Sequence, residues 1–144
     1  MQVKIKKLHP DAQLPRYATP GAAAFDIVAV GDPAPHPTDA RAMHYSTGLA
    51  FEIPPGHVML VFSRSGQGFK EAVRASNAVG VIDSDYRGEL RVSLRSDADN
   101  AVLPKAGERI AQAAIVPVPS VELVEVDELS ETERGAGGFG STGK

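Results

Sequence analysis

Short apolar runs separated by glycine and proline constrain the fold of this chain more than any other feature of its sequence. The 144 residues include 14 glycines and 11 prolines, scattered between apolar stretches that are too short for long helices. Many short runs with turn signals between them are typical of β-sheet layers, so we predict an all-β protein. Because aromatic residues are only 6% of the chain, Val, Ile, Leu and Ala must form most of the core. The length suits one domain.

Composition also excludes several classes of protein. The formal net charge of −3 gives no electrostatic argument for nucleic-acid binding. The chain has no Cys, which excludes disulfides and thiolate zinc sites. The N-terminus lacks the apolar segment of a signal peptide, and no apolar run approaches the length that spans a membrane. We expect a soluble, cytoplasmic protein with no nucleic-acid or membrane partner.

Alternation and turn residues divide the chain into segments. Residues 9–20 and 31–38 are expected to be loops, and residues 69–76 a short helix or an irregular connection. Strict alternation should bury Leu90, Val92 and Leu94 on one face of a strand. We predict strands over residues 3–7, 21–30, 43–53, 57–62, 78–82, 90–95, 101–103, 108–116 and 121–126.

A turn with two carboxylates and a tyrosine lies between two of these strands. Asp83, Asp85 and Tyr86 follow the predicted strand at 78–82, at the tip of what we interpret as a hairpin. Polar groups that rigid strands present from a loop often form functional sites. Because Asp and Ser are frequent turn formers, a solvated acidic turn is the alternative, and the rest of the chain must decide.

Three other stretches place polar groups where they need a partner or a ligand. Asp26 lies inside an apolar strand and must be paired, hydrated or functional, unless it faces water at a sheet edge. Ser63-Arg-Ser-Gly66 can donate to phosphate oxygens, although such residues also form ordinary polar turns. Gln112 interrupts an apolar run and needs a hydrogen-bond partner. His36 and His44 have no nearby Cys or carboxylate cluster, so we expect no metal role for them.

The C-terminal residues 130–144 differ from the core, residues 1–129, because they are polar and rich in glycine. Gly135, Gly137 and Gly140 satisfy the spacing G-x-G-x-x-G. No strand precedes this spacing and the chain ends before a helix can follow, so we exclude a dinucleotide site.

One aromatic residue stands out in this tail. Phe139 lies among glycines, after Arg134 and before Ser141 and Thr142. This arrangement predicts a mobile clasp, in which the ring stacks on a base while the arginine and the hydroxyl groups contact phosphates. A disordered tail is the alternative.

Five stretches, Ala22–Ile27, Ser63–Gly66, Asn77–Tyr86, Gly107–Gln112 and Arg134–Gly143, carry a family resemblance. In this order they resemble the motif set of the homotrimeric dUTP diphosphatases (dUTPases), and the third and fifth are highly specific. The second departs from the usual pattern, since Ser63 stands where Pro or Ala is common and Gln67 where Leu is common. In the first, Ala24 and Phe25 replace the more frequent Gly and Tyr or Leu.

The resemblance implies a jelly-roll-like β-barrel core over residues 1–129. It also implies a homotrimer with three sites at subunit interfaces, in which residues 130–144 of one chain form an arm that closes over a site built by the others. The substrate would be dUTP, cleaved to dUMP and diphosphate, with Mg²⁺ as the cofactor.

The resemblance also implies roles for individual residues. Asp83 matches the carboxylate that activates a water for in-line attack on the α-phosphorus. Tyr86 matches the ring that packs under the deoxyribose and excludes a 2′-hydroxyl, and Asn77 matches the reader of the uracil edge. Asp26 matches the acid that holds water on a triphosphate-bound Mg²⁺, and Arg109, like Asp85, is expected only in structural ion pairs. The expected substrate-binding residues are Arg64, Ser65, Gly66, Asn77, Gly80, Ile82, Tyr86, Gln112, Arg134, Phe139, Gly140, Ser141 and Thr142.

Two rival functions remain at this point. A dCTP deaminase shares the fold but needs a glutamate at the pyrimidine ring, and the third motif contains none there. A bifunctional enzyme that deaminates and then cleaves is a minor possibility. A regulatory protein that binds the nucleotide as a signal is the rival from another class, and an intact Asp83 argues against it.

Overall fold

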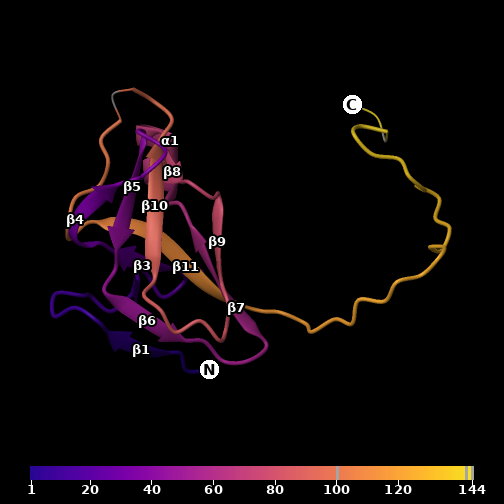
Figure 1. Cartoon of the computed structure of the whole chain (residues 1–144), viewed down its shortest axis with the longest axis horizontal. Helices are drawn as coiled ribbons and strands as arrows, with labels where there is room; N and C mark the ends of the chain where they lie inside the picture. The colour runs from indigo at the N-terminus through magenta and orange to yellow at the C-terminus, as the bar shows by residue number, and fades with distance from the viewer. Residues whose placement is uncertain (100, 142, 144) are drawn as a thin grey trace.

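The computed structural model describes residues 1–99, 101–141 and 143 as three antiparallel sheets and one short helix (Figure 1). The all-β prediction is confirmed. The elements are β1 (Lys4–Lys7), β2 (Arg16–Tyr17), β3 (Phe25–Val28), β4 (Val30–Pro35), β5 (Ala42–Ser46), β6 (Leu49–Glu52), β7 (His57–Phe62), α1 (Ser65–Glu71), β8 (Val73–Ala75), β9 (Val79–Ile82), β10 (Arg91–Ser96) and β11 (Arg109–Pro117).

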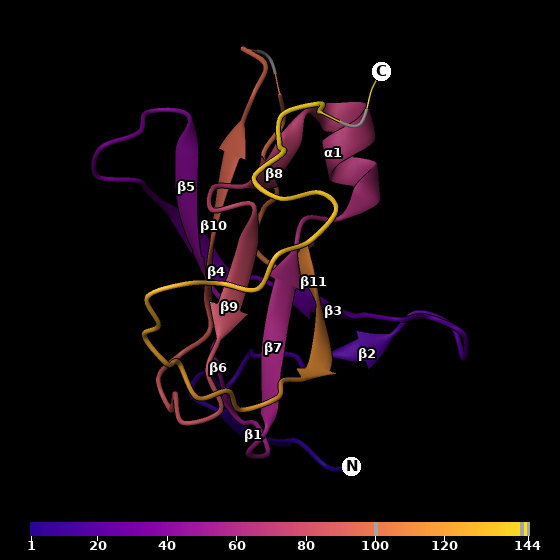
Figure 2. The same ribbon diagram turned by 90° about the vertical axis from the view of Figure 1, so that its right-hand side faces the viewer.

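Two larger sheets enclose the core in a jelly-roll-like arrangement. One has the strand order β4-β5-β10-β8 and the other β2-β3-β11-β7-β9, while β1 pairs only with β6. The largest buried side chains come from both sheets, because Tyr45 and Leu94 belong to the first and Ile27, Met59 and Ile110 to the second. Figure 2 shows α1 at one end of these sheets, beside β8.

Strict alternation predicted β10 correctly. Leu90, Val92 and Leu94 are all buried, as expected for one face of a half-buried strand. The strand predicted at 57–62 is β7, and the strand predicted at 108–116 is β11.

Several other predictions were wrong. Residues 31–38 were expected to be a loop, but β4 covers most of them at the edge of a sheet. Proline is tolerated in an edge strand because backbone N–H groups on the outer side have no strand to pair with. The strand predicted over 43–53 is two strands, because the chain bends between β5 and β6 at Gly48, whose φ is +64°. The strand predicted over 21–30 shrinks to β3, and residues 101–103 and 121–126 form no strand among the described residues.

The interpretation of the central stretch as a hairpin was also wrong. β9 pairs with β7 in the five-stranded sheet, whereas β10 pairs with β5 and β8 in the four-stranded sheet. The connection from Asp83 to Leu90 therefore passes from one sheet to the other.

The register of β11 against β3 contains one irregularity. Gln112 pairs with Asp26 and Ala111 with Ile27, but the next pair is Arg109 with Val28. One extra residue on β11, Ile110, is a β-bulge between these pairs.

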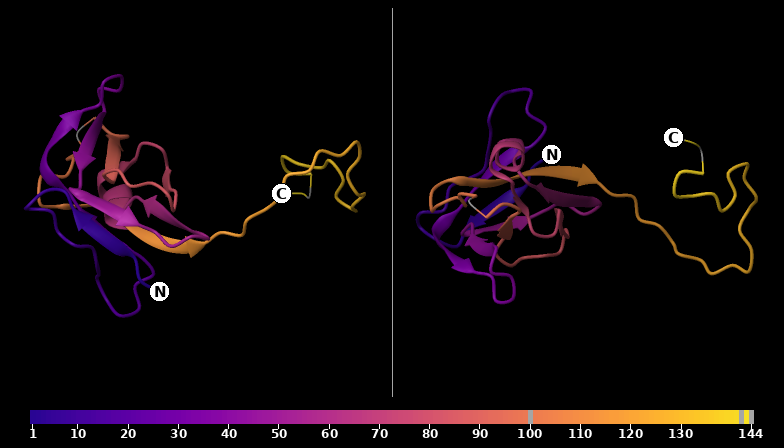
Figure 3. Two further views of the ribbon diagram at one scale, coloured as in Figure 1. Left: turned by 60° about the horizontal axis from the view of Figure 1, so that its bottom comes forward. Right: turned by 90° about the horizontal axis from the view of Figure 1, so that it is seen from above.

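The C-terminal segment leaves the body of the protein after β11. Val118 N donates to Gly56 O at 2.8 Å, and beyond it the chain extends away from the sheets (Figure 3). Leu123, Leu129 and Phe139 are largely exposed. In the described part of the chain no helix is both long and apolar enough to cross a membrane.

Candidate functional site

Asp26, in the middle of β3, lies at the centre of an ion-pair cluster. Arg109 Nη1 is 3.0 Å from Asp26 Oδ2, and Arg64 Nε is 3.3 Å from Asp26 Oδ1. The Asp26 side chain is 19% exposed and that of Arg64 25%, so the pair is partly shielded from water. The three residues come from β3, β11 and the residue before α1. Asp26 thus has the charged partners that its place in an apolar strand required, and Arg109 forms the ion pair expected of it.

Gln112 completes this group, which we call the Asp26 cluster: Asp26, Arg64, Arg109 and Gln112. Gln112 is the register partner of Asp26 on β11, and its Nε2 donates to Ser63 O at 3.1 Å. The Gln112 amide thus holds the backbone of Ser63, which directly precedes Arg64. The cluster has strong donors for an anion on a rigid sheet.

The buried side chain of Gln67 supports the same segment. Gln67 Nε2 donates to Arg109 O at 3.0 Å, and Arg64 Nη1 donates to the same oxygen at 3.4 Å. Ser65 and Gly66 are the first residues of α1. The replacement of Leu by Gln at position 67 therefore adds a tie between α1 and β11.

A groove of about 410 Å³ lies between β9 and β10. Asn77, Gly80 and Ile82 line it together with residues of both sheets. Three of the expected substrate-binding residues thus meet in one concave surface. We call this surface, with Asp83 and Tyr86 at its end, the Asp83 groove.

Asp83 and Tyr86 line a smaller cavity of about 250 Å³ that also includes Ile82. Asp83 directly follows β9 and is exposed. Tyr86 N donates to Asp83 O at 3.2 Å, and Tyr86 Oη donates to Glu89 O at 3.0 Å. These bonds hold the carboxylate and the ring on one turn. Asp85, in contrast, forms no ion pair with any described residue.

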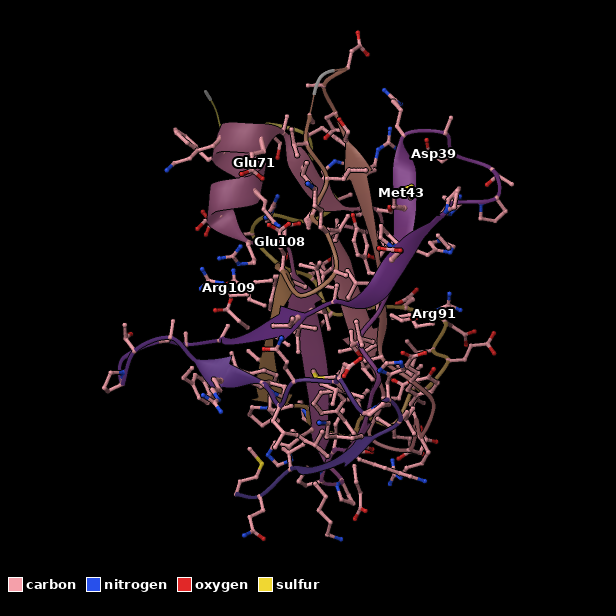
Figure 4. All side chains as sticks on the ribbon, turned by 90° about the vertical axis from the view of Figure 1, so that its left-hand side faces the viewer. Asp39, Met43, Glu71, Arg91, Glu108 and Arg109 are labelled. Carbon is pink, nitrogen blue, oxygen red and sulfur yellow. The ribbon has the colours of Figure 1, made fainter. Side chains whose placement is uncertain are left out.

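The Asp26 cluster and the Asp83 groove line separate cavities in the described part of the chain. Asp26, Arg64 and Arg109 line cavities that include no groove residue. Asn77, Ile82 and Asp83 line cavities that include no member of the cluster. In the view of Figure 4, Arg109 of the cluster is on the left of the ribbon and Arg91, which lines the groove, is on the right. In the described part of the chain the two groups therefore belong to separate concave surfaces.

The expected clasp residues lie apart from both groups. Arg134 Nε donates to Gly137 O at 2.8 Å, a contact within the tail itself. Phe139 is fully exposed and has a φ of +50°, and Gly140 and Ser141 follow it in the same turn. Thr142 lies outside the described residues.

No group of three or more His, Asp or Glu side chains suited to a metal ion occurs among residues 1–99, 101–141 and 143. His36 and His44 stack edge to face with ring centroids 4.6 Å apart. Burial lowers the pKa of His44, and the nearby His36 and Arg91 lower it further. Asp26 is a single carboxylate beside the guanidinium groups of Arg64 and Arg109, an arrangement that would suit an ion taking its other ligands from phosphate and water.

Gly88 and Glu89 were not predicted as site residues, although both contact Tyr86 or the bend that holds its turn. A Cβ at Gly88 would lie 2.6 Å from Tyr86 Cζ, and Glu89 Oε1 accepts from Gly48 N at 2.8 Å. Their position two and three residues after Tyr86, in the same turn, was the only available signal, because the bend at Gly48 is distant in sequence.

Comparisons with known proteins identify the family of this chain. The sequence model of the dUTPase family matches residues 10–143. The chain is 49% identical to the deoxyuridine 5′-triphosphate nucleotidohydrolase of Nautilia profundicola, with all of both chains covered. It is 48% identical to the protein of the same name from a Hydrogenobaculum species, with 99% of each chain covered.

Solved structures lead to the same family. The dUTPase of Staphylococcus bacteriophage 80alpha with dUpNHpp is similar with a TM-score of 0.82 and 28% identity, over 99% of each chain. A mutant dUTPase from phage phi11, described with a coordinated structural Mg(II) ion, shares the fold with a TM-score of 0.75 and 24% identity, over 91% of this chain and 100% of that one. The chain therefore belongs to the dUTPase family.

Proposed function

We propose that this protein hydrolyses dUTP to dUMP and diphosphate, with Asp83 as the general base. The observation that carries the proposal is the position of Asp83, an exposed carboxylate directly after β9 at the end of a groove lined by Asn77, Gly80 and Ile82. A base must lie within hydrogen-bond reach of the water that it activates, and a residue anchored between two sheets meets that need.

In the proposed reaction Asp83 accepts a proton from water while the water oxygen attacks the α-phosphorus in line. The bond from the α-phosphorus to the bridging oxygen breaks, and diphosphate leaves. Asn77 and the backbone near Gly80 and Ile82 bind the uracil edge, and the ring of Tyr86 packs under the deoxyribose. The groove has the concave, partly apolar character that small-molecule sites require.

The Asp26 cluster binds the triphosphate in this proposal. Arg64 and Gln112 donate to phosphate oxygens, with Ser65 and Gly66 at the start of α1. A Mg²⁺ ion bound to the triphosphate would offset its charge and align it for displacement. Asp26 would hold that ion through water, which a lone carboxylate suits because Mg²⁺ keeps several waters and prefers phosphate oxygens.

We further propose a homotrimer in which the two groups meet across subunit interfaces. The separation of the Asp26 cluster from the Asp83 groove supports this, as does the C-terminal arm that leaves its own body (Figure 3). The arm of one protomer, with Arg134, Phe139, Gly140 and the hydroxyl residues Ser141 and Thr142, closes over the site of others. A ring stacked on the base would exclude water from the triphosphate.

Product analysis with the purified protein, Mg²⁺ and dUTP, dCTP, dTTP or UTP tests the function. We expect dUMP and diphosphate from dUTP and little turnover of the other three. Ammonia released from dCTP would assign the protein to deamination. Tight dUTP binding without turnover would favour a regulatory role and remove the role of Asp83.

A further inference from the structure

The turn that carries Tyr86 is fastened to the bend between β5 and β6. Glu89 Oε1 accepts a hydrogen bond from Gly48 N at 2.8 Å in a partly buried position. On either side of this contact, Leu90 N donates to Leu49 O at 2.8 Å and Thr47 Oγ1 donates to Leu90 O at 2.6 Å. The carboxylate bond is charge-assisted, so it contributes more than a neutral hydrogen bond.

The bend itself has little freedom to move. Gly48 has a φ of +64°, a region that favours glycine. A Cβ at this position would lie 2.8 Å from His9 Cβ and 2.9 Å from Ala12 Cβ, so the N-terminal loop packs directly on the Gly48 backbone. The anchor for Glu89 is therefore part of the rigid body of the protein.

Two contacts connect the anchored Glu89 segment to the ring of Tyr86. Tyr86 Oη donates to Glu89 O at 3.0 Å, which ties the end of the ring to the backbone of the anchored residue. The ring also lies against Gly88, where an added Cβ would be 2.6 Å from Tyr86 Cζ and 2.9 Å from Cε2. Since Tyr86 is 46% exposed, these contacts rather than burial set the position of its ring.

We propose that Glu89 is a positioning residue for Tyr86 and that Gly88 provides the surface on which the ring rests. Together they set the distance between the ring and the sugar, and so the discrimination against a 2′-hydroxyl. Glu89 acts through Tyr86 and is not itself a catalytic residue. The inference rests on the proposed function, because it concerns how that site selects deoxyribose.

The test compares kcat and KM for dUTP and for UTP in the wild type and the variants Glu89→Ala, Glu89→Gln and Gly88→Ala. We expect Glu89→Ala to lower the ratio of kcat/KM for dUTP to that for UTP about tenfold, because a charge-assisted hydrogen bond is lost. Glu89→Gln should largely restore the ratio, since its amide oxygen can accept from Gly48 N. Gly88→Ala should lower the ratio with Glu89 intact, because the methyl group displaces the ring.

Glu52→Ala is the matched control. Glu52 pairs with Lys4 at 2.7 Å on the surface of β6. The charge of Arg87, in the Tyr86 turn, helps to lower the pKa of Glu52, but no hydrogen bond or ion pair joins Glu52 to a described residue of that turn. Its removal should therefore leave the ratio unchanged. A merely structural role for Glu89 would lower the rates for dUTP and UTP by the same factor, and that result would overturn the proposal. If Glu89→Ala does not fold, an unchanged ratio in Gly88→Ala would overturn it instead.

A measurement in the free protein separates this inference from the proposed function. We expect the Tyr86 ring resonances in NMR spectra to shift in Glu89→Ala and Gly88→Ala, and to stay in place in Glu52→Ala. If the resonances shift in both variants but the wild-type protein does not hydrolyse dUTP, the proposed function is refuted and the positioning role of Glu89 is not. Unshifted resonances in both variants would refute the positioning role, whatever the activity.

Discussion

The Asp26 cluster and the Asp83 groove contain similar polar groups, but the chain holds them in different ways. In the cluster, Asp26 is already paired with Arg64 and Arg109. In the groove, the side chains of Asp83 and Asn77 make no hydrogen bond to any described residue. The cluster is a preformed network on one rigid sheet, whereas the groove presents free polar groups at an inter-sheet turn.

This difference indicates what a ligand meets in each group. Arg64 uses Nε for Asp26 and Nη1 for the carbonyl oxygen of Arg109, and a guanidinium has further N–H donors, so a phosphate can bind Arg64 while the carboxylate stays in place. In the groove, the unpaired side chains gain their first hydrogen-bond partner when the ligand arrives. A ligand therefore adds to an existing network in the first group, whereas the second group is open from the start.

The largest effect should come from the free carboxylate of the groove. Asp83→Asn keeps the size of the side chain but removes its ability to take a proton, so we expect dUTP turnover to fall by at least about a hundredfold. Binding of a non-hydrolysable dUTP analogue, measured by calorimetry, should change little. Undiminished turnover would show that Asp83 is not the base.

Mixing two inactive variants tests whether the two groups meet across an interface. Asp83→Asn lacks a working groove and Arg64→Ala lacks a working cluster, so neither homo-oligomer should be active. When equal amounts are unfolded and refolded together, random assembly should restore about a quarter of wild-type activity, since each group comes from a different protomer. Both variants in one chain serve as the control, and a mixture as inactive as that control would mean that each site uses groups from a single chain.

Removal of the arm should have a smaller effect. A chain that ends before Arg134 keeps both the cluster and the groove but loses the aromatic ring that would stack on the base. We expect kcat/KM for dUTP to fall about tenfold or more, from the usual contribution of base stacking. The thermal midpoint should stay near that of the full chain, because the tail contributes no core residue. A truncated protein with full activity would exclude the clasp.

The smallest effect concerns a residue that links the two sheets. Tyr45, in the first sheet, donates to Pro104 O at 3.0 Å, in the connection that leads from β10 to β11. Tyr45→Phe should lower the free energy of unfolding by about 1 kcal/mol, the usual net contribution of one hydrogen bond. Denaturant titration measures this, and activity should be unchanged.

The same residue predicts a pH dependence at the alkaline end. Burial raises the pKa of Tyr45 to about 12, and the nearby Glu108 adds to the shift. The neutral phenol is therefore favoured in the folded state, so its contribution to stability is complete below pH 10 and is lost as the pH rises toward 12. Wild type should lose stability over this range more steeply than Tyr45→Phe.

Local pattern predicted the central strands because their alternation is strict, as the burial of Leu90, Val92 and Leu94 shows. Local pattern failed where pairing with a neighbouring strand decides whether a segment becomes a strand. Residues 30–35 form β4 despite two prolines, because an edge strand needs donors on one side only. Residues 121–126 have a strand-like composition, but no described segment of the same chain pairs with them.

For the candidate site, the first four motifs identified residues that the fold gathers into two groups, whereas the described residues of the fifth motif lie apart in the tail. Sequence could not place Glu89, since its partner Gly48 lies 41 residues away and interacts through its backbone. Nor could it show that β9 and β10 belong to different sheets. Closeness in sequence suggested a hairpin, but the strand partners are set by long-range packing.

The bulge at Ile110 limits how the fourth motif can vary in length. Arg109 and Gln112 are three residues apart, an odd separation that in a regular strand sends the two side chains to opposite faces. The extra residue brings Arg109 opposite Val28, two positions from Asp26, so that the guanidinium and the Gln112 amide share the face of that carboxylate. Deleting one residue between Arg109 and Gln112 would remove the bulge and turn the arginine side chain away from Asp26. The spacing of this motif therefore has to stay fixed for the ion pair to form.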